Sequence, residues 1–249
     1  MSPRPANAEQ GQHEILEAAA VIVAEQGFHG MSMRDLARAT SRSLSSLYHY
    51  FPSKHALLAA IHIRAFDSLN ACARDACRPS DPPSTRLYAF IYQHVRYVVE
   101  HPAVMRVLVG EAGALLPTDR ALVRQRKEAY FEILRAIVAD VLLSGCHHTT
   151  PVPEVAGVDV DRATYNLFGM INWIYAWYEP EVHGSVADVT RSVHSLALCG
   201  LVTQCPQRPV QDAAEPRLRG LMLHNPLSLR VSGDEQNDAG ELPNSRRAG

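Results

Sequence analysis

The chain has 249 residues, of which 47 % are hydrophobic, and it carries a formal net charge of −2. This apolar share supports a substantial core in one large domain or two smaller ones, so disorder throughout is excluded. No stretch approaches the roughly 18 to 20 uninterrupted apolar residues that a membrane span needs. The opening residues, MSPRPANAEQGQHEIL, lack the apolar core of a secretory signal, and we therefore expect a cytoplasmic protein.

Cysteine usage and local charge narrow the classes further. The five cysteines, an odd number at irregular spacing with no CxxC motif, indicate neither a disulfide framework nor a zinc ribbon. The small net charge argues against indiscriminate binding to polyanions, but a whole-chain sum can hide a local basic face. Residues 32–55 hold four basic side chains against Asp35 alone, a local charge of +3. The basic excess therefore lies in one short segment.

Apolar residues recur at three- and four-residue steps along most of the chain, which is the period of an α-helix. In chain order, helices are predicted over about residues 8–26, from residue 33 to the ATSRS segment, and over about 44–50, 53–77, 84–100, 102–115, 118–143, 159–178 and 185–203. Gly27 is a natural residue to end the first of these helices. Ser32 with Asp35 resembles a capping box, and Ser53 is a further N-cap.

The fold class follows from what is missing as well as from the helical period. No sustained alternating strand pattern or hairpin signal occurs, so an all-α fold is predicted. The segment RPSDPPS at 78–84 breaks the pattern and is expected to be a boundary or hinge. Three regions are assigned: a helix-turn-helix head (1–55), a larger helical domain (56–204), and a tail (205–249) whose prolines and acidic clusters predict disorder.

Two short helices between residues 33 and 50, preceded by a long one, have the outline of a helix-turn-helix. The second begins with LSS at 44–46, a slim first turn that lets the backbone enter the major groove. Tyr48 and His49 at its far end have polar tips that can reach phosphate oxygens, and Lys54 stands at the start of the next helix. The chemistry of this segment is therefore typical of a DNA-binding head.

A resemblance to the N-terminal DNA-binding domain of TetR-family regulators is carried by residues 15–58, which read ILEAAAVIVAEQGFHGMSMRDLARATSRSLSSLYHYFPSKHALL. The strongest part of the match is LYHYFPSK. The resemblance implies an all-α homodimer with nine to ten helices per subunit, in which each head reads one half of a palindromic operator in double-stranded DNA. It also implies that the C-terminal domain binds a small-molecule inducer and dimerises through the helices at about 159–178 and 185–203.

The turn before the second short helix departs from the family pattern, which has a glycine and a small apolar residue where this chain has Ser41 and Arg42. Ser41 is expected to adopt an unfavourable backbone conformation. Arg42 can contact phosphate or a guanine edge. The predicted DNA contacts are Arg34, Arg42, Ser43, Leu44, Ser45, Ser46, Tyr48, His49 and Lys54, whereas Leu47, Tyr50 and Phe51 are expected to pack within the head.

A second informative stretch is GMINWIYAWYEP, residues 169–180, which is part of a segment that is apolar nearly all round. Such a helix must be covered on several sides. The stretch resembles a run in the branch of the TetR family that responds to acyl-CoA thioesters. That resemblance implies a mostly apolar tunnel that opens toward arginines able to hold nucleotide phosphates. The candidate arginines are Arg106, Arg120, Arg124 and Arg162, each with an exposed, solvated role as the alternative.

Ligand contacts are predicted at His94, Arg106, Phe168, Asn172, Trp173 and Trp177. His94 falls on the apolar side of its helix, where it is either a pocket hydrogen-bond donor or a satisfied buried histidine. Core or dimer packing is the alternative for both tryptophans. No cofactor is expected apart from the inducer, for which an acyl-CoA is one candidate.

The sequence therefore predicts a ligand-responsive DNA-binding transcriptional repressor. One alternative is a ligand-insensitive helical dimer that serves as a scaffold or adaptor. A hydrolytic enzyme is a weaker one, because Ser46 and His49 have no acidic partner or oxyanion-hole motif and no catalytic residue is assigned. The segment CHH at 146–148 has residue types that bind metals, but three consecutive side chains cannot easily point at one ion, so no metal site is predicted.

Overall fold

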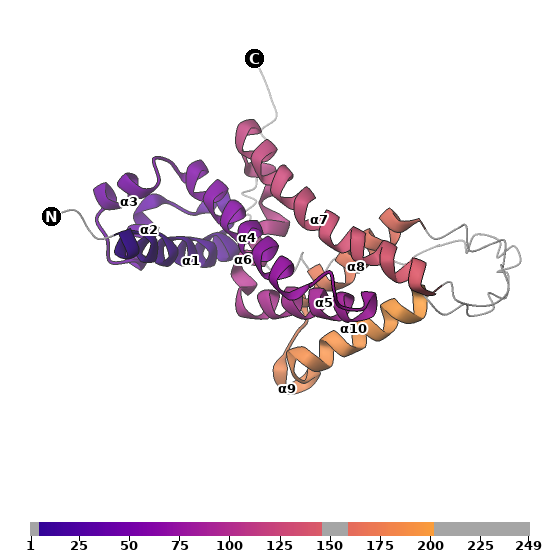
Figure 1. The fold of residues 1–249 in the computed structure, drawn as a ribbon. Coiled ribbons are helices and arrows are strands. Elements are labelled where there is room, and N and C mark those ends of the chain that lie inside the picture. The colour runs from indigo at the N-terminus through magenta and orange to yellow at the C-terminus, as the bar shows by residue number, and fades with distance from the viewer. Residues whose placement is uncertain (1–4, 146–158, 202–249) are drawn as a thin grey trace, which may run out of the picture. The chain divides into compact units, whose positions relative to one another are not determined.

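The computed structural model describes residues 5–145 and 159–201, which belong to one compact unit within residues 1–205. In these ranges the chain forms helices and no strand, so the all-α prediction is confirmed (Figure 1). The helices are α1 (Pro5–Gly30), α2 (Met33–Ala39), α3 (Leu44–Tyr50), α4 (Lys54–Ala76), α5 (Pro83–Glu100), α6 (Pro102–Gly110), α7 (Pro117–Gly145), α8 (Val160–Asn172), α9 (Pro180–His183) and α10 (Val186–Leu201), with short 3-10 helices η1 (Ala112–Ala114) and η3 (Ile174–Ala176).

Some of the expectations fall on parts of the chain that are not described. The tail assigned to 205–249 and the CHH segment at 146–148 lie outside the described residues. The division into head and body at residues 55 and 56 stays a prediction. Among the described helices, none is long and apolar enough to cross a membrane.

The starts of the head helices follow the predicted caps. Ser32 Oγ accepts a hydrogen bond from the Asp35 amide at 3.2 Å, and the Asp35 carboxylate accepts one from the Ser32 amide at 3.1 Å, which completes the capping box of α2. Ser53 Oγ accepts from the Ala56 amide at 3.0 Å and caps α4. Hydroxyls at these starts satisfy amides that have no partner inside the helix, and so fix where each helix begins.

Gly27 interrupts α1 with a backbone that only glycine adopts readily, at φ 74° and ψ 161°. The helical geometry is therefore broken where the first helix was predicted to end, and one further turn after the kink reaches Gly30. Phe28, next to the kink, is buried in the head core. Its amide donates to Glu111 Oε1 at 3.0 Å, which ties this end of α1 to the segment between α6 and η1.

The turn between α2 and α3 contains the strained residue that the sequence predicts. Ser41 has φ 51°, the left-handed region that favours glycine, and no other non-glycine residue in the described ranges has a positive φ. The Arg42 amide donates to the Ala37 carbonyl at 3.0 Å, which closes the turn and holds this conformation.

Replacing Ser41 by glycine is expected to stabilise the protein by about 0.5–1 kcal/mol, because glycine adopts positive φ without the penalty of a Cβ atom. Urea unfolding followed by circular dichroism measures the change. Ala39→Gly is the matched control, since Ala39 ends a helix with ordinary backbone angles and glycine there is destabilising. Equal loss of stability in both variants would contradict strain at Ser41.

Helix α5 forms the centre of the body and packs against α4, α7 and α10 (Figure 1). Its apolar stripe is fully buried at Leu87, Phe90, Ile91, Val95 and Val98. One of two buried clusters holds residues of α1 to α4 together with Val104, Val107, Leu115 and Val123, and the α5 side chains belong to the other. Large apolar side chains on α4, α7, α8 and α10 complete the cluster, so one face of each of these helices is covered.

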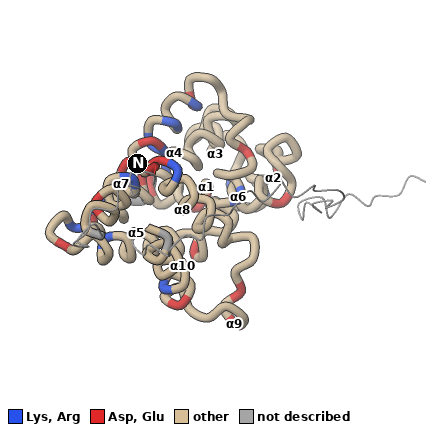
Figure 2. The backbone as a smooth tube through the Cα atoms, turned by 90° about the vertical axis from the view of Figure 1, so that its right-hand side faces the viewer, with Lys and Arg blue, Asp and Glu red and all other residues tan. Residues whose placement is uncertain are grey.

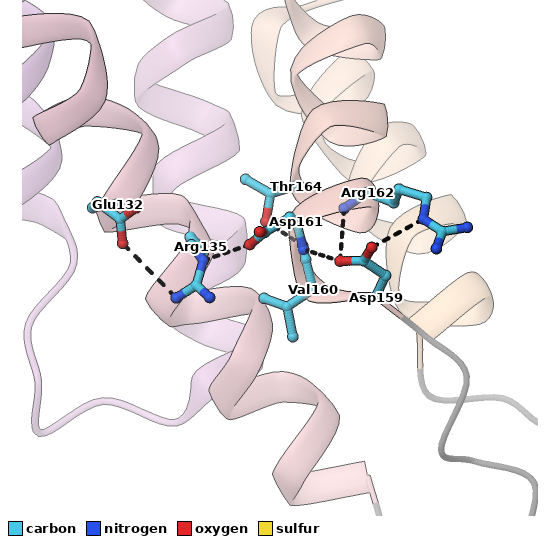
Figure 3. A network of polar contacts seen from close by, with 7 residues as sticks. All are labelled: Glu132, Arg135, Asp159, Val160, Asp161, Arg162 and Thr164. Carbon is cyan, nitrogen blue, oxygen red and sulfur yellow. Dashed lines mark hydrogen bonds and ion pairs between the residues drawn. The ribbon is translucent and has the colours of Figure 1, made fainter.

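Polar contacts fix the start of α8 against α7 (Figure 3). Asp159 caps α8 by accepting from the Asp161 amide at 2.9 Å, and its carboxylate also pairs with Arg162 at 3.0 Å. Arg135 of α7 donates to Asp161 at 2.6 Å. These contacts orient α8 over α7, and Leu167 and Ile171 of α8 lie in the body core.

The helix predicted over 159–178 is too long, since α8 ends at Asn172 and the chain continues as η3. The amides of Ala176 and Trp177 donate to the carbonyls three residues earlier, at 3.0 and 3.2 Å. The apolar spacing remains helical through Tyr178, so periodicity does not distinguish this tighter turn from an α-helix. The prediction over 102–115 is likewise divided into α6 and η1, and α9 was not predicted.

Candidate nucleic-acid interface and ligand cavity

Helix α3 has one buried face and one exposed face. Leu47 is fully buried and Phe51, its C-cap, is 6 % exposed, whereas Leu44 is 36 % and Tyr48 48 % exposed. Ser43 Oγ caps the helix by accepting from the Ser46 amide at 3.1 Å. Ser45 and His49 are exposed as well. A slim, polar, two-turn helix is thus held from beneath and open on its outer side, as a major-groove reader requires.

Two of the cations expected to contact DNA are engaged within the head. Lys54 Nζ donates to the His29 carbonyl at 3.1 Å and lies 4.5 Å from the centre of the Phe28 ring. Arg42 pairs with Glu14 of α1 at 2.9 Å and lies over the Tyr50 ring. Each therefore braces the helix-turn-helix, and a phosphate contact by either has to coexist with these bonds or replace them.

Basic and acidic side chains are intermixed on α2 and along the other described helices. Arg34 is exposed on α2, one turn before Arg38, which pairs with Asp35. Figure 2 shows lysines and arginines interspersed with acidic residues along the described helices. Attraction to a polyanion therefore depends on the local excess around α2 and α3 rather than on the charge of the whole chain.

The body contains a partly open cavity of about 480 Å³, within the range of small-molecule sites. Four of the predicted ligand contacts line it, namely His94, Phe168, Asn172 and Trp173. Arg106 is exposed on α6 and does not line it, and Trp177 lines a different surface. The remaining walls are Phe66, Leu69, Met105, Leu108, Val109, Ala112, Lys127, Tyr130, Phe131, Tyr165 and Gly169.

A buried polar pair lies in this cavity. His94 and Tyr130 are 2 % and 3 % exposed, and His94 Nδ1 and Tyr130 Oη are 3.0 Å apart. Burial lowers the pKa of His94 to about 4, while the nearby Asn172 side chain acts in the opposite direction. Burial also raises the pKa of Tyr130. Both groups are therefore neutral at physiological pH.

Aromatic rings surround the polar pair. Phe90 stacks on Tyr130 with ring centres 4.9 Å apart, and Phe168 meets Tyr130 at 5.7 Å and Phe131 at 5.9 Å. Sequence reasoning missed Lys127, Tyr130 and Phe131 of α7. Their only sequence signal was the close spacing of a rare lysine and two rings on one helix, which says nothing about the cavity they face.

The other candidate arginines do not line the cavity. Arg120 donates to the carbonyls of Gly113 and Leu115, both at 3.0 Å, and so closes the loop after η1. Arg162 pairs with Asp159 at the start of α8. Arg124 is exposed on α7. Within the described residues, Lys127 is the one charged side chain in the cavity wall.

A second hollow is an open groove of about 830 Å³ along α8 and α10. Its apolar side chains are unusually exposed: Met170 is 38 %, Trp173 42 %, Trp177 41 %, Tyr165 65 % and Leu196 63 % accessible. A contiguous apolar surface of this kind marks an interaction site. Trp173 lies at the border of both hollows, and so both alternatives stated for it, ligand contact and packing between chains, remain open.

A braced helix-turn-helix head joined to a helical body with a partly open cavity is the architecture of a ligand-responsive DNA-binding regulator. Residues 15–61 match the sequence model described as bacterial regulatory proteins of the tetR family, and residues 80–201 match that of the tetracyclin repressor-like C-terminal domain. The chain belongs to the TetR family, as its sequence predicts. It is a DNA-binding transcriptional regulator, and the family is one of regulators rather than enzymes.

Three relatives illustrate the match. The TetR-family regulator PfmR of Thermus thermophilus is 31 % identical, with a TM-score of 0.65 over 75 % of this chain and 98 % of that one. The transcriptional repressor KstR2 of Mycobacterium tuberculosis is 26 % identical over 193 residues, 77 % of this chain and 92 % of its own length. AibR, solved with isovaleryl coenzyme A and operator DNA, is 24 % identical, with a TM-score of 0.63 over 77 % of this chain and 98 % of that one.

Proposed function

We propose that the protein is a repressor that binds a palindromic operator as a homodimer and is released when a small, mostly apolar inducer enters the body. The aromatic cavity beneath α8 carries this proposal, because a scaffold or adaptor has no use for one. The repressor role is supported by KstR2, a relative named as a transcriptional repressor. The open groove along α8 and α10 supports the dimer.

An acyl-CoA thioester is the first inducer class to test. AibR was crystallised with isovaleryl coenzyme A, although an identity of 24 % makes that ligand a proposal for this chain. A cavity of about 480 Å³ is within the range of small-molecule sites, so in this proposal the acyl group enters it and the nucleotide stays at its mouth. The phosphates then stay outside, near Lys127 in the cavity wall.

Release requires that the inducer favour an arrangement of the heads that does not fit DNA, and the coupling is reciprocal. The segment after α6 offers a physical link. Leu108 and Ala112 line the cavity, and Glu111 between them accepts the hydrogen bond from the Phe28 amide of the head. A ligand that shifts this segment acts directly on the end of α1.

Binding to DNA fragments that flank the protein's own gene, followed by fluorescence anisotropy, tests the regulator. We expect a salt-sensitive complex that acyl-CoA thioesters dissociate, because phosphate contacts release counterions. A complex that forms but ignores every thioester would remove the acyl-CoA proposal and leave the repressor.

Lys127→Gln is expected to weaken acyl-CoA binding about fivefold, the effect of about 1 kcal/mol that a partly exposed ion pair contributes. Isothermal titration with isovaleryl-CoA measures the change. Arg124→Gln is the matched control, because Arg124 is exposed on the same helix, one turn earlier, but does not line the cavity. Similar losses of acyl-CoA affinity in both variants would mean that the positive charge of α7 attracts the ligand from a distance and that Lys127 makes no direct contact with it.

A further inference from the structure

The polar end of the cavity carries an unsatisfied group. His94 Nε2 has no hydrogen-bond partner although His94 is 2 % exposed and lines the cavity. Buried polar atoms are nearly always paired, so one without a partner at the wall of a cavity is ready for a ligand atom. Because an imidazole nitrogen is either a donor or an acceptor, its tautomer decides which ligand atom fits.

The contact with Tyr130 fixes the tautomer. If the Tyr130 hydroxyl donates to His94 Nδ1, the ring proton is on Nε2, and one buried N–H is left without a partner. If Nδ1 donates instead, both the phenolic proton of Tyr130 and the lone pair of Nε2 are left without partners. Each unsatisfied buried group costs free energy, so the first arrangement is favoured. His94 therefore presents an N–H donor to the cavity.

The surroundings determine the charge of the group that this donor can accept. Phe168 lies edge-on to the His94 ring, with ring centres 6.2 Å apart. The Tyr130 ring is nearly parallel to the His94 ring, with ring centres 6.0 Å apart. Burial keeps the imidazole neutral, with its pKa lowered to about 4, so His94 itself supplies no positive charge. A carboxylate that accepts from this N–H would lose its hydration without gaining a charged partner from the imidazole, which is costly. A neutral acceptor avoids that loss.

We propose that His94 is the specificity-determining residue of the cavity and selects ligands whose buried end carries an uncharged carbonyl, as in a ketone, ester or thioester, rather than a carboxylate or a plain hydrocarbon. The inference rests on the proposed function only in taking this cavity as the inducer site. Asn172 lies on the same wall and can add a second contact to the carbonyl oxygen. Tyr130 is a positioning residue that holds the His94 donor in place.

Three naphthalenes of nearly equal size test the preference, since they differ only in the group at one ring position: 2-acetylnaphthalene, 2-isopropylnaphthalene and 2-naphthoate. Isothermal titration with the full chain is expected to show the ketone binding about tenfold more tightly than the hydrocarbon, the effect of one neutral hydrogen bond, and the carboxylate binding most weakly. Tightest binding by 2-naphthoate, equal binding of all three, or binding of none would overturn the proposal.

Substitutions of His94 separate hydrogen bonding from shape. His94→Leu is expected to abolish the advantage of the ketone over the hydrocarbon, and measurable binding of the hydrocarbon shows that the cavity is intact. His94→Gln retains an N–H donor and is expected to keep part of the advantage. If the ketone still binds tenfold more tightly to His94→Leu, the donor is another group and the assignment of His94 is wrong.

Nuclear magnetic resonance gives a ligand-free readout. Nitrogen-15 spectra of the histidines at neutral pH are expected to show His94 with its proton on Nε2, and Tyr130→Phe is expected to mix the two tautomers. A proton on Nδ1 in the wild type would overturn the inference. Dissociation of DNA by acyl-CoA thioesters does not depend on any of these results, so failure here is distinguishable from failure of the proposed function.

Discussion

Leu196→Glu is expected to convert the proposed homodimer to a monomer and to lower its affinity for its operator by about 100-fold or more. Leu196 is 63 % exposed and lies in the groove along α8 and α10. In a two-fold symmetric interface both copies of a residue change at once, so two carboxylates enter an apolar contact. Burying unpaired charge there costs far more than the leucine contact alone contributed.

The loss of DNA affinity follows from the loss of the second head. A single head retains mainly phosphate contacts, and non-specific binding is typically weaker than specific binding by about a thousandfold or more. Sedimentation velocity gives the oligomeric state, and anisotropy with the operator gives the affinity. Both measurements are needed, because a monomer that still binds tightly would show that the heads act independently.

Leu143→Glu is the matched control, since Leu143 is 72 % exposed on α7 and is not part of the groove. It carries the same change of charge and hydrophobicity. We expect it to remain dimeric and to bind the operator normally. If Leu196→Glu is also dimeric, the subunits meet through a different surface and the assignment of the groove is wrong.

Local sequence was sufficient to predict the head. The predicted caps Ser32 and Ser53 each accept a hydrogen bond from a backbone amide at a helix start. These signals act between residues three or four positions apart, so they can be read without knowledge of the fold. The strain at Ser41 was predictable for the same reason, because one turn geometry requires a positive φ.

The cavity could be predicted only in part. Periodicity placed His94 and Phe168 on apolar faces, but it did not reveal that Tyr130 would meet both of them. That meeting depends on how α5, α7 and α8 cross, which is a property of the packed body rather than of any one helix. The bond between the Phe28 amide and Glu111 spans 83 residues and is beyond local patterns for the same reason.

Arg42 shows why a residue type alone does not define a role. The sequence offered it as a DNA contact because it stands beside α3. In the structure its guanidinium pairs with Glu14 and covers Tyr50, so it connects the turn to α1. A contact between Arg42 and DNA stays a prediction. It requires that the guanidinium either bind Glu14 and a DNA group together or leave Glu14 for the DNA.

Tyr48→Phe is expected to weaken operator binding by about 100-fold or more. The Tyr48 side chain is 48 % exposed at the outer end of α3, where its hydroxyl can donate to a phosphate oxygen. A hydrogen bond to a charged group is worth roughly 1.5–3 kcal/mol. A dimer makes the contact twice, so about 3–6 kcal/mol is lost when the two heads act additively. The reduction should be similar for all DNA sequences, because phosphates carry no sequence information.

Tyr50→Phe makes the same change two residues away and serves as the control. Tyr50 packs against the head core, and its hydroxyl lies beside Gly11 of α1. A Cβ atom added to Gly11 would be 3.1 Å from this hydroxyl. We expect this variant to bind the operator with unchanged affinity. Anisotropy titrations of both variants against operator and random DNA separate the cases. Equal losses would mean that α3 acts through its stability, whereas a loss for Tyr48→Phe alone assigns its hydroxyl to the DNA backbone.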